Sequence, residues 1–408
     1  MSSSTGAPPP STLRPTATPS LARARVAVAC AAAACAAVAC AAPDVPPPTS
    51  PKPIPDAAVS VMEIDAPNEQ STGVASDASA PDAAEIVATV ADSAPPQPEV
   101  WLKGSTHVHA RPSGDSTTPL PDVIAWYEAN RYDFIVLTDH NRTTETQQGA
   151  SLMVIPGIEL THNPSNCIPP GDKSGKCRIH VNLLGVTGKV DGKLVWANRK
   201  TQERLPKYEA ALEVQKQLGG VAQINHPNWF WGMNGDLLAE LARRGFRLVE
   251  IANAAFEKWN QGDKDHPSLD ALWDQALVQG VTLWGIASDD AHDYEPSNSP
   301  TKYPAGGGWV VVKAQRTPQA ILAALAAGRF YASNGVVLHR AEVDGDALVV
   351  EVAAGQRGSY LIDFIENGKR VERVKARSAR RTLPATGYLR ALVTRGDGTK
   401  AWVQPARR

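Results

Sequence analysis

Two imidazoles one residue apart are the first residues in this chain whose types and spacing suggest chemistry. His107 and His109 close a short apolar run, and Asp115 follows six residues after the second histidine. On a β-strand, residues i and i+2 point to the same side, so both histidines would grip one metal ion. A lone His-x-His is a weak signal. The prediction of a metal site therefore depends on similar clusters elsewhere in the chain.

Such clusters recur along the chain, most of them directly after an apolar run. Together they offer nine nitrogen and oxygen donors, which are His107, His109, Asp115, His140, Glu159, His180, His226, Asp290 and His292. Nine donors exceed what one tetrahedral zinc needs, but they suffice for several ions bridged by carboxylate and hydroxide. The sequence thus predicts two or three divalent ions, with Zn, Mn or Fe as candidates. His162, His266 and His339 fit no cluster, and we interpret them as structural.

The segments that would position these donors alternate between strands and helices. Runs such as 134–137 and 281–287 are apolar on both faces, and helix-like segments such as 202–218 separate them. This pattern predicts an α/β fold with a parallel sheet covered by helices. About seven or eight such units favour a closed barrel, in which catalytic groups lie at the C-terminal ends of the strands. Beyond about Gly335 the pattern changes to hairpin strands with turns such as Asn367-Gly368, which predicts a small antiparallel β-sandwich.

The N-terminal quarter of the chain has a different composition. Residues 1–42 combine arginines, no acid and an Ala-rich apolar run from Val26, as in an export signal. A membrane-spanning helix is the competing interpretation, but the run falls short of about 20 strongly apolar residues. Residues 37–40 resemble a lipoprotein cleavage site at Cys40, with ordinary cleavage nearby as the alternative. Residues 43–98 are rich in Pro, Ala and Ser and predict a disordered tether. The barrel would occupy residues 99–335 and the β-sandwich residues 336–408.

These features predict an exported protein: periplasmic, an outer-membrane lipoprotein or secreted. The membrane would be contacted only through an N-terminal lipid anchor. Cys167 and Cys177 lie outside the presumed signal, and we expect them to form a disulfide. Thiolate metal binding is the alternative, although their spacing is not Cys-x-x-Cys. The 41 basic and 42 acidic residues form no basic stripe, which argues against nucleic acid and favours a small-molecule partner.

The donor segments, taken in order, resemble the motifs of the PHP (polymerase and histidinol phosphatase) superfamily. The matching segments are His-Val-His with Asp115, Leu-Thr-Asp-His-Asn, Pro-Gly-Ile-Glu, Arg-Ile-His-Val-Asn-Leu-Leu-Gly, Ile-Asn-His-Pro and Ser-Asp-Asp-Ala-His. The Asp-Asp-Ala-His form, the segment 328–335 and the trailing β-domain look most like the CehA/McbA metallohydrolase branch. The resemblance covers about Trp101 to Gly335. It implies a distorted (β/α)7 barrel with up to three metals.

The resemblance also implies a role for each donor. His107 and His109 would hold the first metal, Glu159 would bridge, and Asp290 would complete that site, with Asp289 as its substitute. Asp115 and His140 would belong to neighbouring metal sites. The remaining donors would complete the cluster, and they are His180, His226 and His292. Asp115 departs from the pattern of members that carry a third histidine at this position.

Metal ions lower the pKa of bound water from about 15.7 toward about 7 and clamp oxygens that gain charge. The predicted function is therefore a metal-dependent hydrolase that uses a metal-bridged hydroxide to cleave a phosphoester of a small anionic molecule. We assign the catalytic roles to Glu159, Asp290, His292 and Arg142. Arg142, and in the first loop Arg111, are placed to contact an anionic substrate group.

Three alternatives remain open from the sequence. A carbamate or carboxylic ester hydrolase would use the same metal core. An amidohydrolase-type barrel also opens with His-x-His, but it typically adds a strand-end lysine, and no lysine stands at such a position here. A tethered, non-catalytic binding protein would use the metals structurally.

Overall fold

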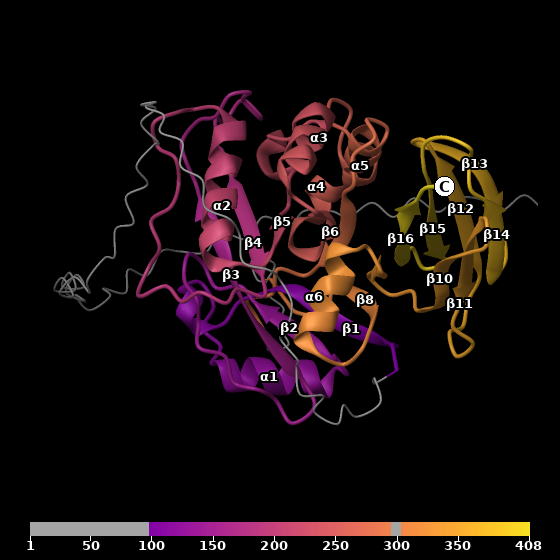
Figure 1. The fold of residues 1–408 in the computed structure, drawn as a ribbon, viewed down its shortest axis with the longest axis horizontal. Coiled ribbons are helices and arrows are strands. Elements are labelled where there is room, and N and C mark those ends of the chain that lie inside the picture. Colours follow the sequence, from indigo (N-terminus) through magenta and orange to yellow (C-terminus); the bar gives the residue numbers. More distant parts are fainter. Residues whose placement is uncertain (1–97, 295–302) are drawn as a thin grey trace, which may run out of the picture. The chain divides into compact units, whose positions relative to one another are not determined.

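The structure is a computed structural model that describes residues 98–294 and 303–408 (Figure 1). The predicted export signal, the lipidation site and the tether up to residue 97 lie outside these residues. Every helix in the described part of the chain is too short or too polar to cross a membrane.

The first part of the described chain alternates strands with helices, as expected. Its strands are β1 (Val100–Val108), β2 (Phe134–Leu137), β3 (Met153–His162), β4 (Ile179–Leu184), β5 (Val221–Ile224), β6 (Leu248–Asn253), β7 (Trp284–Ser288), β8 (Trp309–Ala314) and β9 (Phe330–Ser333). Its helices are α1 (Leu120–Ala129), α2 (Arg204–Leu218), α3 (Gly235–Arg244), α4 (Glu257–Gln261), α5 (Leu269–Leu277) and α6 (Pro318–Ala326), with short 3-10 turns η1 (Arg111–Ser113), η2 (Trp229–Trp231) and η3 (Ala254–Phe256).

The sheet of this part is mixed rather than wholly parallel. Strands β1, β2 and β3 are parallel neighbours, and so are β5, β6 and β7. Strand β4 runs antiparallel to both β3 and β5, and β8 runs antiparallel to β1. The expectation of an α/β fold with parallel strands is confirmed, but the all-parallel sheet is wrong at β4 and at β8. At β4 the reason is that no crossover helix separates β3 from β4, so the chain returns antiparallel.

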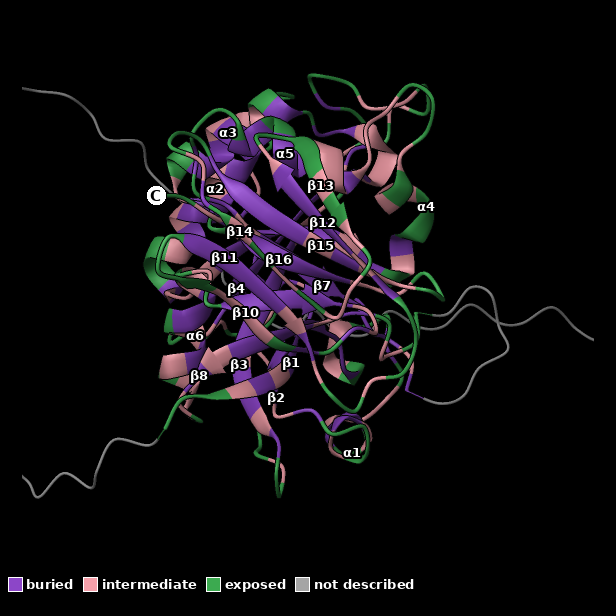
Figure 2. Ribbon diagram, turned by 90° about the vertical axis from the view of Figure 1, so that its right-hand side faces the viewer, coloured by how far each residue is buried: buried purple, intermediate pink, exposed green. Residues whose placement is uncertain are grey.

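The hydrogen bonds do not confirm a closed barrel. The strand ladder ends at β7, and within the described residues only an isolated bridge between Val108 and Ala291 links the end of β1 to the segment after β7. Most strand residues of the molecule are buried, as Figure 2 shows, because helices and neighbouring strands cover them. Strand β2 is buried at all four positions, as its unbroken apolar run predicts.

The C-terminal part is antiparallel and has two layers. Its strands are β10 (Leu338–Asp344), β11 (Ala347–Val352), β12 (Tyr360–Glu366), β13 (Lys369–Val374), β14 (Ser378–Thr382), β15 (Leu389–Arg395) and β16 (Lys400–Ala406). Strands β10, β11 and β14 form one layer, and β13, β12, β15 and β16 form the other, with an apolar core that includes Ile362, Phe364 and Val393.

This part is joined to the first by backbone and side chains. Strand β16 pairs with β9, so one layer continues the main sheet across the boundary predicted at residue 335. Arg390 of β15 is 1% exposed and makes two 2.7 Å hydrogen bonds to the carboxylate of Asp274 on α5. The Tyr388 hydroxyl donates to the same carboxylate at 2.6 Å. A buried ion pair therefore fixes the C-terminal strands against α5.

Candidate metal centre

The end of β1 presents two buried histidines to the same side. His107 and His109 are both fully buried, as alternate residues of one strand face can be. Their Nε2 atoms lie 3.0 and 3.2 Å from Oδ1 of Asp290, which follows β7. The same two atoms lie 3.5 and 3.6 Å from the carboxylate of Glu159. Segments almost 200 residues apart in sequence thus meet around one small space.

Glu159 lies at the centre of this space. His140 Nδ1 is 2.6 Å from Oε2, while His180 Nδ1 and His226 Nε2 lie 2.9 and 3.8 Å from Oε1. Burial by itself would raise the pKa of Glu159, but the surrounding histidines hold that pKa well below its usual range. The sequence placed Glu159 after a strand, whereas it lies inside β3, which continues to His162.

A second group of donors lies nearer the solvent. Asp115 Oδ2 is 2.8 Å from His140 Nε2 and 3.2 Å from His292 Nε2, and the Asp115 side chain is 47% exposed. The rings of His109 and His292 stack with centroids 4.2 Å apart. The structure therefore brings all nine predicted donors together. Eight of them form three overlapping groups, and within each group the ligand atoms lie within 4.8 Å of one another. The ninth, Asp290, contacts His107 of these groups.

Several of these atoms have no hydrogen-bond partner although they are buried. They are His107 Nε2, His109 Nε2 and Glu159 Oε2. The two imidazole nitrogens lie close to carboxylate oxygens, and the carboxylate oxygen lies close to an imidazole nitrogen, but these contacts lack hydrogen-bond geometry. Burying polar atoms without a partner costs free energy unless a cation binds between them. The donor set of imidazoles and carboxylates suits Zn²⁺, Mn²⁺ or Fe²⁺. The residues therefore fit divalent metal ions.

Glu250 on β6 is a buried residue that the sequence analysis missed. Its carboxylate accepts hydrogen bonds from His107 Nδ1 at 2.7 Å, from the Ser288 hydroxyl at 2.6 Å and from the backbone N–H of His226 at 2.6 Å. Because Nδ1 of His107 is engaged, its Nε2 faces the cluster. The available signal was an acid inside an apolar strand, Leu248–Ile251, where an unpaired charge would be too costly to bury.

The adjacent acids Asp289 and Asp290 point in different directions. Asp290 adopts a left-handed conformation with φ 51° and faces the histidines of β1. Asp289 instead accepts hydrogen bonds from the Ser105 hydroxyl at 2.9 Å and from the backbone N–H of Gly306 at 2.7 Å. Burial raises the pKa of Asp289 to about 6. Backbone strain at the strand end therefore separates the roles of two neighbouring carboxylates.

The two predicted anion contacts, Arg142 and Arg111, form no bond with the donors among the described residues. Arg142 forms no ion pair or hydrogen bond with the cluster among the described residues, and its charge acts on Asp139 instead. Arg111 is exposed and donates to the carbonyl of Thr117. The histidines interpreted as structural also stay outside the donor groups: His162 contacts Lys207, and His266 stacks on Trp231.

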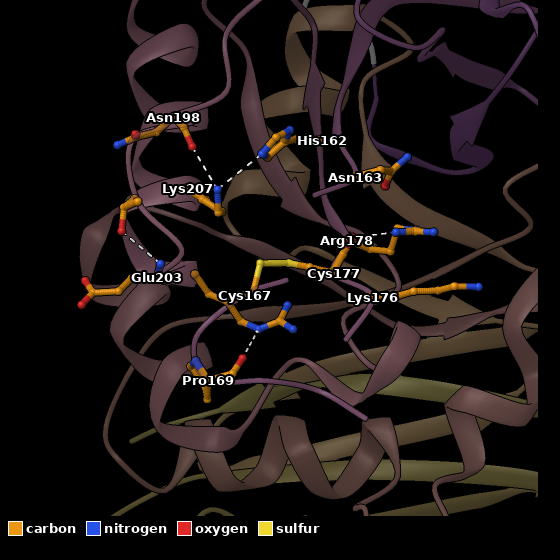
Figure 3. Close-up of a disulfide and its surroundings, with 12 residues drawn as sticks. His162, Asn163, Cys167, Pro169, Lys176, Cys177, Arg178, Asn198, Glu203 and Lys207 are labelled. Atoms are coloured by element: carbon orange, nitrogen blue, oxygen red, sulfur yellow. Dashed lines mark hydrogen bonds between the residues drawn. A yellow bond between two sulfur atoms is a disulfide. The ribbon is translucent and has the colours of Figure 1, made fainter. Parts of the chain in front are cut away.

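The disulfide predicted between Cys167 and Cys177 is present, with Cα atoms 5.7 Å apart (Figure 3). It closes the connection from β3 to β4, which we call the disulfide loop (residues 163–178). At the start of this loop, Asn163 Oδ1 lies 2.8 Å from Nε2 of His180. The loop thus orients one of the donors and leaves its Nδ1 facing Glu159.

Comparisons with known proteins give distant structural likenesses. The chain matches the crystal structure of a two-domain protein from Bacteroides vulgatus ATCC 8482 that contains a predicted PHP-like metal-dependent phosphoesterase. The match has 16% sequence identity and a TM-score of 0.38, and it covers 77% of this chain and 90% of that one. No family model and no curated protein matches the sequence.

Proposed function

We propose that this protein is a PHP-type metal-dependent hydrolase that cleaves a phosphoester of a small anionic molecule. The observation that carries the proposal is the set of nine clustered donors, in which three buried atoms, His107 Nε2, His109 Nε2 and Glu159 Oε2, have no hydrogen-bond partner among the described residues. The motif order supports assignment to the CehA/McbA branch within the superfamily, and with it a distorted (β/α)7 barrel. The N-terminal composition supports export, with a lipid anchor at Cys40 as one form.

The residues of this chain would hold the ions at three overlapping positions. His107, His109 and Glu159 form one group of donors, and Glu159, His180 and His226 form the next. The third group is made by His109, Asp115, His140 and His292, with Asp290 between it and the first. Ions bound there would supply Lewis acidity that polarises a substrate oxygen and lowers the pKa of water.

The residues around the cluster orient its donor side chains and shield them from water. Glu250 fixes the orientation of His107, and Asn225 donates to Glu159 Oε1 at 3.0 Å. The indole of Trp229 packs edge-on against His180 and His226, with ring centroids 5.6 and 5.1 Å away. An apolar wall on this side would exclude water from the cluster and strengthen its electrostatic interactions.

The test is a metal count combined with an activity panel on the full chain. We expect two or three metals per chain by mass spectrometry and turnover of phosphate esters that a chelator abolishes. His109→Gln should lose at least one metal and most of the activity, whereas the matched control His339→Gln, at an exposed position outside the cluster, should change neither. Carboxylic esters and carbamates in the same panel test the alternative chemistry. Fewer than two metals without turnover would favour a non-catalytic binding protein.

A further inference from the structure

Beside the metal cluster lies an arginine whose charge no carboxylate balances. Arg178 ends the disulfide loop, two residues before His180, and within the described chain it forms no ion pair with an acid. One guanidinium nitrogen donates to the carbonyl of Cys177 at 2.7 Å, while the buried Nε has no partner. An arginine is rarely left half-buried in this way, because its charge is costly to remove from water.

Two aromatic rings, rather than a carboxylate, pack against this guanidinium. Its central carbon lies 5.0 Å from the ring centroids of both Trp229 and Phe230. A cation over an aromatic face is attracted by the ring without losing its net charge. Arg178, Trp229 and Phe230, which we call the arginine platform, therefore present a fixed guanidinium that makes a single hydrogen bond to the described residues.

The platform is built by two loops that pack closely together. The backbone N–H of Asp172 in the disulfide loop donates to the carbonyl of Phe230 at 3.1 Å. A Cβ at Gly171 would lie 1.8 Å from that same carbonyl oxygen, so only glycine allows this approach. Phe230 itself has a left-handed φ of 58°. Figure 3 shows Arg178 and Asn163 extending to the same side of the disulfide, away from Lys207.

The indole of Trp229 separates the Arg178 guanidinium from the metal cluster. Trp229 contacts Arg178 through its face and contacts His180 and His226 edge-on. From this arrangement we infer that Arg178 is the specificity-determining residue of the hydrolase, binding an oxyanion group of the substrate, a carboxylate or a phosphate, about one ring's width from the bond that is cut. The inference rests on the proposed function. It assigns to Arg178 the role that the sequence suggested for Arg142 and Arg111.

The test uses two non-hydrolysable probes that differ in one anionic group. 4-Phosphonobenzoate carries a phosphonate and a carboxylate across one ring, and phenylphosphonate lacks the carboxylate. Calorimetric titration of the full, oxidised, metal-loaded chain should show tighter binding of 4-phosphonobenzoate, by about tenfold to a hundredfold, as expected for charge-assisted hydrogen bonds. Arg178→Gln should abolish this difference, Arg178→Lys should restore part of it, and the matched control Arg370→Gln, an exposed arginine on β13, should preserve it.

The outcomes separate this inference from the proposed function. If Arg178→Gln lowers the affinity for both probes equally, Arg178 contacts the phosphonate that the two probes share. That result supports the oxyanion-binding role, with the reacting phosphoryl group as the oxyanion. If Arg178→Gln binds both probes as the wild type does, while its metal content and melting temperature are unchanged, the inference is wrong. Chelation of the wild type tests the metals independently. Probe binding that survives chelation and still depends on Arg178 would refute the metal mechanism and leave the arginine platform standing.

Discussion

Glu250→Gln is the sharpest test of how the centre is organised, because it changes one charge and almost no volume. The carboxylate of Glu250 receives hydrogen bonds on both oxygens, from His107 and Ser288 on one and from the backbone of His226 and the Asn253 amide on the other. A glutamine offers only one acceptor oxygen, so its amide group must face donors on the other side. His107 would lose a charged partner and with it both orientation and basicity.

The size of the effect follows from this geometry. Loss of a carboxylate that orients a ligating histidine typically costs about tenfold to a hundredfold in metal affinity, which is about 1.4–2.8 kcal/mol for the ion concerned. Competition against a chelating indicator measures it, and activity at limiting metal should fall in parallel. Asp274→Asn is the matched control, since this buried carboxylate binds Arg390 far from the cluster and should lower stability without changing metal affinity. Wild-type affinity in Glu250→Gln, or an equal loss in Asp274→Asn, would refute the reasoning.

Three further predictions concern stability. Arg390→Met should lower the free energy of unfolding by about 3–5 kcal/mol, because it strands the buried carboxylate of Asp274; urea unfolding should show most of this loss recovered in the double variant with Asp274→Leu, and no recovery would contradict the ion-pair explanation. Replacing Cys167 and Cys177 by serine should cost about 3 kcal/mol, from the loop entropy of a ten-residue separation, and a reductant should reproduce that loss in the wild type. Burial lowers the pKa of Lys103 to about 8 from its usual 10.5, so the unfolded chain binds more protons between those values and stability should rise with pH across them; Lys103→Met should abolish that rise.

Much of the candidate centre could be predicted from the sequence because its signals are local. The two histidines of β1 share a side by the geometry of any strand, and donors that follow apolar runs are gathered wherever the ends of neighbouring strands meet. For that reason the nine predicted donors lie together even though the sheet around them is mixed. The same local logic identified the Cys167–Cys177 disulfide from two cysteines bracketing a loop.

Residues that act through distant partners could not be found in this way. Glu250 and His107 are 143 positions apart, and their hydrogen bond depends on how β6 faces β1 across the interior. Arg178 looked no different from Arg111 or Arg142 until the fold set it against Trp229. Whether an arginine is paired, solvated or free is decided by neighbours that only the packed chain supplies.

The sequence by itself determined which side chains can bind metal and that strands and helices alternate, because both follow from residue type and short-range periodicity. The tertiary structure alone decided the direction of β4, the separate orientations of Asp289 and Asp290, and the neighbours that hold each donor. These depend on strand register and loop path, which are set by the packing of the whole chain and leave no local pattern to read.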